Sequence, residues 1–157
     1  MIKKKTLTII LPSALIILSI ATFIICLFMN FIEFQDGGST IIKSVIVTFL
    51  YAMVWILILI IGILIKNRGI VKYILLFWII TLIISVFMVY ANLVTNPGTI
   101  GQSISNILFP LILLFAGQWY GVRFFVSTTL NLYIIVVVIS LLMVVIATLW
   151  LNRNELT

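Results

Sequence analysis

Long apolar runs dominate this chain and leave only short polar segments between them. The first extends from Thr6 to Phe31 and the second from Ser44 to Ile65, and neither contains a charged residue. A helix needs about 20 mostly apolar residues to cross the roughly 30 Å hydrocarbon core of a bilayer. Because both runs reach that length, lipid rather than water is the expected surrounding of these segments.

The composition supports the same interpretation for the whole chain. Hydrophobic residues occupy 65% of the 157 positions, charged residues occupy 8%, and the mean hydropathy is +1.45. A soluble domain needs a surface with roughly 25–35% charged residues, which this chain does not have. We therefore predict an all-α integral membrane protein, with residues 1–157 forming one transmembrane domain.

Five segments are predicted to cross the membrane. They cover approximately residues 6–31, 44–65, 73–94, 106–122 and 130–151. Polar segments with turn residues separate the first three, and Asn96-Pro97-Gly98 follows the third. The fourth is the least regular, although Asn106 is a suitable N-cap and Pro110 would fall near the first turn. The alternative is four crossings, with the fourth run forming a re-entrant or interfacial segment.

The basic residues predict a cytoplasmic N-terminus, since cytoplasmic loops carry an excess of Lys and Arg. With five crossings, only Lys43 and Arg153 lie outside, and the C-terminus lies outside as well. The cytoplasmic residues are then Lys3, Lys4, Lys5, Lys66, Arg68, Lys72 and Arg123. In the re-entrant alternative, Arg123 and Arg153 exchange sides, so the charge count does not distinguish the two topologies. The five-helix arrangement is preferred.

The first apolar run resembles a secretion signal in its basic start, Lys3–Lys5. A signal-peptide core has about 7–15 apolar residues and ends at a small-residue cleavage site. This run is much longer, lacks an A-x-A pattern, and has Ile25 rather than a small residue before Cys26. It is predicted to remain as the first membrane helix.

The stretch FAGQWYGVRFF, residues 115–125, interrupts the apolar pattern. Gly117 and Gly121 form a G-x-x-x-G pair, which in an α-helix puts two positions without side chains on one face and lets two backbones approach closely. Ala116 would widen that face, and Gln118 could donate a hydrogen bond to another helix. These four residues are the predicted helix-packing site.

The same stretch ends in residues typical of the membrane interface. Trp119 and Tyr120 are expected to anchor the helix at the headgroup level, and Arg123 could extend its guanidinium to the phosphates. The alternative is a functional one, in which Gln118 and Arg123 line a cavity for an anionic ligand.

Small and weakly polar residues recur at helical spacing in the other apolar runs, which favours a bundle packed through these faces. The sets are Thr8, Pro12, Ser19, Thr22 and Cys26; Ser44, Thr48 and Ala52; Thr81, Ser85, Met88 and Asn92; and Ser140 and Ala147. The alternative is a polar path for a substrate, although hydroxyl groups without a neighbouring charge make a poor ion pathway.

Residue types that carry catalysis are scarce. The chain has no histidine and a single cysteine, and its acids are Glu33, Asp36 and Glu155, all outside the predicted spans. A proton-coupled carrier would need a titratable group inside the membrane, and nucleophilic triads need a positioned base. We therefore predict no catalytic, cofactor-binding or metal-binding residues, and a protein that is not an enzyme.

The predicted function is that of a small multi-pass protein of a bacterial plasma membrane that acts by helix–helix contact. Accessory or regulatory subunits and immunity-type protective proteins belong to this class. Its partners would be the lipid bilayer and other membrane proteins, or further copies of itself. The net charge of +6 lies at the ends of apolar runs, so nucleic acid is not expected as a partner. The alternative is a small transporter or channel component that works as an oligomer.

Overall fold

The computed structural model describes residues 2–36, 42–93, 110–126 and 128–153, and for 2–9 and 32–36 it describes the backbone alone. These residues are almost entirely helical. The elements in chain order are α1 (Ile2–Asp36), α2 (Ile42–Leu64), α3 (Arg68–Leu93), a 3₁₀-helix η1 (Gly117–Phe125) and α5 (Thr129–Arg153). Residues 110–116 are α-helical and lead directly into η1.

Four of these helices are long and apolar enough to cross a membrane: α1 over Ile10–Phe31, and α2, α3 and α5 over their full lengths. They coincide with four of the predicted apolar segments. The fifth predicted crossing, 106–122, is not confirmed. Its first residues lie outside the described ranges, and its remainder is α-helical to residue 116 and then continues as the 3₁₀-helix η1.

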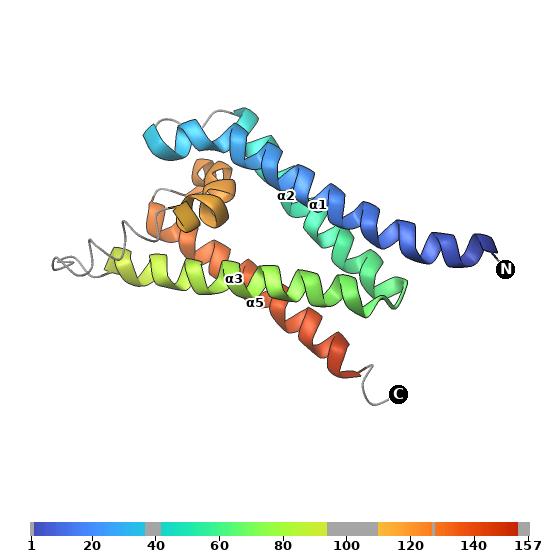
Figure 1. The fold of residues 1–157 in the computed structure, drawn as a ribbon. Helices are drawn as coiled ribbons and strands as arrows, with labels where there is room; N and C mark the ends of the chain where they lie inside the picture. The colour runs from blue at the N-terminus through green and yellow to red at the C-terminus, as the bar shows by residue number, and fades with distance from the viewer. Residues whose placement is uncertain (1, 37–41, 94–109, 127, 154–157) are drawn as a thin grey trace.

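The positions of the helix ends show how the described helices follow one another through the bundle. Figure 1 shows the beginning of α1, the connection from α2 to α3 and the end of α5 at one end of the bundle. Helix α3 ends, and α5 begins, at the opposite end. The segment that contains η1 therefore starts and finishes on the same side of the bundle. Residues 110–126, which contain η1 and lie near that end, are called the re-entrant segment below because of this path within the bundle.

A short helix C-cap joins α2 to α3. The N–H of Asn67 donates to the carbonyl of Gly62 at 3.0 Å, and the N–H of Lys66 donates to the carbonyl of Ile63 at 3.1 Å. This pair of bonds is a Schellman motif, and Lys66 takes the left-handed conformation that it requires, with φ of 53°. The Asn67 side chain then accepts a bond from Ile70 N at 3.1 Å and caps α3. Two helix ends are thus satisfied within a few residues, which explains the abrupt reversal.

The bundle is built from two pairs of helices. Helix α3 packs along α5, α1 packs against α2, and a contact between α2 and α3 joins the pairs. Aromatic rings fill the centre, where Trp55 stacks on Phe77 with 4.1 Å between ring centroids. Trp78 lies against both rings in edge contact. Such ring pairs contribute stability beyond that of the apolar area they bury. They hold the two helix pairs together more specifically than aliphatic side chains alone would.

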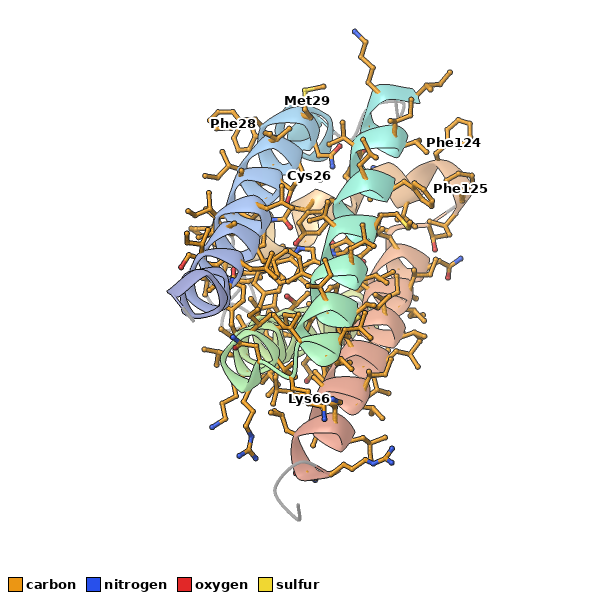
Figure 2. All side chains as sticks on the ribbon, turned by 90° about the vertical axis from the view of Figure 1, so that its right-hand side faces the viewer. Cys26, Phe28, Met29, Lys66, Phe124 and Phe125 are labelled. Atoms are coloured by element: carbon orange, nitrogen blue, oxygen red, sulfur yellow. The ribbon has the colours of Figure 1, made fainter. Side chains whose placement is uncertain are left out.

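Most of the small polar residues predicted to share helix faces point inward. Those that are buried are Ser19, Cys26, Ser44, Thr48, Thr81, Ser85, Ser140 and Ala147. Large apolar side chains point outward instead, as with Phe28 (74% exposed), Leu64 (73%) and Phe125 (71%) (Figure 2). Small and polar residues that face inward, among the aromatic rings of the centre, and large apolar side chains that face outward are the arrangement expected of a bundle surrounded by lipid.

Candidate functional site

The re-entrant segment occupies one end of the bundle. Its 3₁₀-helix η1 contacts α1 and α2 and, less extensively, α5. A 3₁₀-helix has poorer hydrogen-bond geometry than an α-helix and is normally short. At membrane depth, such a backbone is tolerated where protein covers it. The contacts of η1 with α1 and α2 provide that cover.

A buried polar cluster lies where η1 meets α1 and α2. We define it as the side chains of Cys26, Asn30, Ser44 and Thr48 together with the main-chain carbonyl of Gln118. Three of these side chains donate to that one carbonyl: Asn30 Nδ2 at 3.0 Å, Thr48 Oγ1 at 2.9 Å and Cys26 Sγ at 3.4 Å. Two helices and the re-entrant segment thus meet at a single oxygen atom.

Asn30 is the residue that connects the rest of the polar cluster. Its amide nitrogen also lies 3.0 Å from Thr48 Oγ1 and 3.4 Å from Cys26 Sγ. Its amide oxygen accepts a bond from the hydroxyl of Ser44. All four side chains are buried. Because each donor already has an acceptor within the polar cluster, the arrangement is that of a structural connection, in which each interhelical bond contributes about 0.6–1.7 kcal/mol.

Gly121 allows η1 to approach α2 this closely. A Cβ atom built on Gly121 would overlap the main-chain carbonyl oxygen of Ser44 and would lie 2.5 Å from Thr48 Oγ1. The obstacle is partly backbone, which cannot rotate away as a side chain can. Gly121 is thus the position at which η1 and α2 come into contact, one turn beyond the polar cluster's carbonyl at Gln118.

The other predicted packing residues are also buried, but they do not form one face. Ala116 and Gly117 are enclosed by protein, and Gln118 is fully buried. In a 3₁₀-helix with three residues per turn, positions four apart differ by about 120° around the axis. Gly117 and Gly121 therefore point in different directions, whereas the prediction assumed an α-helix. The Gln118 side chain donates to the carbonyl of Leu114 at 2.6 Å, within its own segment.

The predicted interface anchors have different surroundings from those expected. Trp119 and Tyr120 are 2% and 1% exposed, so they pack inside the protein and do not face lipid headgroups. Trp119 contacts Tyr51 and Trp78, with centroid distances of 5.8 and 5.9 Å. Arg123 is half-buried, and its Nη1 donates to Tyr120 Oη at 2.6 Å. The path of the re-entrant segment places Trp119 against Tyr51 of α2 and Trp78 of α3. The prediction had assumed that the helix would end at the membrane surface with these aromatic residues.

The chemistry available in this region is that of neutral groups. The polar cluster contains amide, hydroxyl, thiol and carbonyl groups. Within the described ranges, no three His, Cys, Asp or Glu side chains come together as a metal site. Gln118 and Arg123 do not meet in one cavity among the described residues: Gln118 Nε2 donates to the carbonyl of Leu114, and Arg123 donates to Tyr120. The amide oxygen of Gln118 is buried and has no hydrogen-bond partner among the described residues. Glu155 and the side chains of Glu33 and Asp36 lie outside what the structure describes.

Asn30 was not among the residues singled out from the sequence. It lies in the stretch FMNFIEF, near the end of the first apolar run, where an asparagine resembles the beginning of a loop. Its spacing from Cys26 is the available signal, because residues four apart share a helix face. An amide directly above a cysteine, on the face that also carries Ser19, indicates an inward-facing polar position.

Comparisons with protein families, with curated proteins and with solved structures find no match for this chain. The fold therefore defines the class by itself: a small helical protein with four helices suited to crossing a membrane and a short re-entrant segment held by a polar cluster.

Proposed function

We propose that this chain is a small multi-pass protein of a bacterial plasma membrane that acts by contact with another membrane protein, without catalysing a reaction. An accessory or regulatory subunit, or an immunity-type protective partner, would act in this way. The polar cluster is the observation that carries the proposal. Its donors are engaged with acceptors on neighbouring segments of the same chain, so these polar groups hold the fold together.

The proposed topology has four crossings, by α1, α2, α3 and α5, with both termini in the cytoplasm. On this arrangement seven basic residues lie on the cytoplasmic side, and Lys43 and Arg123 lie outside. The cytoplasmic set is Lys3, Lys4, Lys5, Lys66, Arg68, Lys72 and Arg153. An excess of this size is what the positive-inside rule associates with the cytoplasm.

Helix α1 offers a surface for such contact. It packs against α2 and η1 on one side, and its other side exposes Ala14, Ile17 and Ala21. Small residues at a seven-residue spacing lie on one face and permit another helix to approach closely. Helix α1 is also about 52 Å long at 1.5 Å per residue, which exceeds the hydrocarbon thickness and extends the surface beyond the membrane.

Site-specific photo-crosslinking in native membranes tests the proposal. A photoreactive residue at Ile17 or Ala21 should form a covalent product with one distinct membrane protein, identified by mass spectrometry. The matched control is the same residue at Leu149, which is 64% exposed on α5. Products with lipid alone at Ile17 and Ala21 would contradict the proposal.

The oligomeric transporter or channel remains the competing function. It predicts crosslinks between copies of this chain at the same positions, because a pore would have to form between protomers. Purified protein in liposomes would then pass a solute without a second component. That combination of results would replace the proposed function.

A further inference from the structure

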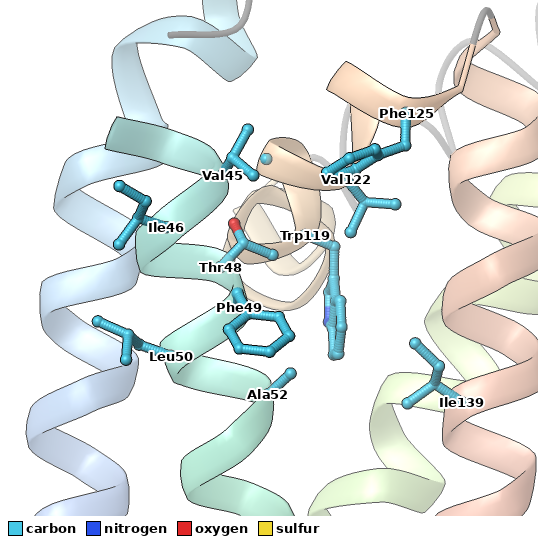
Figure 3. Close-up of a pocket in the computed structure, with 11 residues that line it drawn as sticks. Val45, Ile46, Thr48, Phe49, Leu50, Ala52, Trp119, Val122, Phe125 and Ile139 are labelled. Atoms are coloured by element: carbon cyan, nitrogen blue, oxygen red, sulfur yellow. The ribbon is translucent and has the colours of Figure 1, made fainter. Parts of the chain in front are cut away.

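A groove runs along the lipid-facing seam between α2 and α5, which barely touch each other. One part of it has a volume of about 400 Å³ and a second part about 420 Å³. The two parts share Ala52, Trp119 and Ile139 in their walls, so they adjoin each other along the seam. Figure 3 shows Trp119 standing in the gap, with Ala52 on α2 and Ile139 on α5 at either side. We call this feature the α2–α5 groove.

The second part of the α2–α5 groove, of about 420 Å³, suits a hydrocarbon chain better than a protein helix. Its walls consist of apolar side chains, mainly branched ones such as Ile60, Leu142 and Ile146. Close helix packing in membranes depends on small residues, and Ala52 is the one small residue among those that line this part of the groove. A flexible chain can fill the irregular space between branched side chains, whereas a rigid helix would rest on top of them.

Both walls of the groove lead to a basic residue at the same end. On α5, Ile139, Ile146 and Arg153 are spaced by seven residues and so follow one face. On α2, Ile63 lines the groove and Lys66 comes three residues later, just past the helix end. Both cations are exposed. Figure 2 shows Lys66 at the end of the bundle opposite Phe124 and Phe125.

The backbone at Lys66 adds a separate observation. Its left-handed conformation is one that glycine adopts freely and that costs other residues about 1–2 kcal/mol. A lysine at this position is therefore unfavourable for the C-cap itself. A requirement for positive charge at the mouth of the groove would account for it.

We propose that the α2–α5 groove binds an anionic phospholipid from the leaflet at the basic end of the bundle. One acyl chain lies between α2 and α5 and reaches Trp78 and Trp119. The phosphate lies between Lys66 and Arg153. Basic residues flanking a gap between membrane helices are a recurring way to bind such headgroups. This site is independent of the partner-binding function proposed above.

Tryptophan quenching by brominated lipids tests the site in the full-length protein. Trp55→Phe with Trp150→Phe leaves Trp78 and Trp119, which are 1% and 2% exposed and line the groove. The protein is reconstituted in vesicles of phosphatidylcholine that contain a small fraction of phosphatidylglycerol brominated on its acyl chains. Quenching should show roughly a tenfold preference over brominated phosphatidylcholine at the same fraction.

Matched variants separate the groove from general membrane effects. Lys66→Gln with Arg153→Gln should reduce the preference to near one, whereas Lys43→Gln, at the other end of α2, should leave it unchanged. Ala52→Phe fills the point where the two parts of the groove meet and should reduce quenching of Trp119. Met53→Phe is its control, because Met53 is 41% exposed and is not part of the groove lining.

Equal quenching by brominated phosphatidylglycerol and brominated phosphatidylcholine, or no quenching by either lipid, would overturn the proposal. If the Trp55→Phe protein does not fold, native mass spectrometry of the wild-type chain replaces the optical measurement. Bound phosphatidylglycerol should then persist under conditions that remove phosphatidylcholine, and it should be lost in the Lys66→Gln, Arg153→Gln protein. Retention of phosphatidylglycerol by that double variant would also overturn the assignment.

Discussion

The side-chain amide of Asn30 donates a hydrogen bond to the main-chain carbonyl of Gln118 at 3.0 Å and so joins α1 to the re-entrant segment. The two residues are 88 positions apart in the chain. Because η1 has nine residues and is therefore unusually long for a 3₁₀-helix, it depends on neighbouring helices for stability. The polar cluster around this bond is the most specific of those contacts.

Replacing Asn30 with leucine should therefore destabilise the protein. The substitution removes the donors to Gln118 and Thr48 and leaves the hydroxyl of Ser44 without its acceptor. We expect a loss of about 1–3 kcal/mol in the free energy of unfolding. Denaturation in mixed micelles, followed by circular dichroism, measures it.

Asn92→Leu provides the control for that experiment. Asn92 is exposed on α3, and its amide bonds the carbonyl of Met88 in the same helix at 2.9 Å. The change should alter stability by less than about 0.5 kcal/mol. Equal losses in the two variants would mean that the polar cluster has no special role.

Gly121→Ala tests the close approach between η1 and α2. The new methyl group would meet the backbone of Ser44, so one segment must move, at an expected cost of about 1–3 kcal/mol. The comparison is Gly69→Ala, where the nearest atom is the Asn67 side-chain oxygen at 3.2 Å. Thermal unfolding in detergent should show a much larger effect at position 121. A harmless alanine there would show that η1 is placed differently.

Lys66→Gly should raise stability, because glycine adopts the left-handed conformation at the C-cap of α2 without strain. The expected gain is about 1 kcal/mol. Lys66→Ala removes the same charge but keeps the backbone strain, so it should give no comparable gain. Similar stabilisation by both variants would attribute the effect to charge and not to conformation.

The sequence was sufficient to predict the helices but not the path between them. Runs such as Ser44–Ile65 are long and free of charge, so their helical structure follows from the need to satisfy backbone groups in lipid. The stretch around Gly117 and Gly121 has no such constraint. Its length permits a crossing, and a G-x-x-x-G pattern has the same appearance in an α-helix and in a 3₁₀-helix.

The candidate site was predictable in part for a similar reason. Ser44, Thr48 and Cys26 lie on faces that helical spacing identified as inward. What they bond to, the carbonyl of Gln118, is a main-chain atom that carries no signal in the sequence. Trp119 was misplaced because the prediction relied on the usual interfacial position of tryptophan, whereas a re-entrant turn carries it inward to Tyr51 and Trp78.

The topology gives the last prediction, which distinguishes four crossings from five. With four crossings, Thr128, just before α5, lies outside, and Asn152, near the end of α5, lies in the cytoplasm. With five crossings the two sides are reversed. Both residues are exposed, so a cysteine at either position would be accessible to a reagent in the adjoining solution.

Single-cysteine variants in intact cells measure this directly. Cys26→Ser removes the native thiol and keeps a hydroxyl that can donate to the carbonyl of Gln118 in its place. In that background, Thr128→Cys should react with a membrane-impermeant maleimide before lysis, and Asn152→Cys should react only after lysis. With the N-terminus in the cytoplasm, as the basic residues predict, the opposite pattern would mean that the segment containing η1 crosses the membrane.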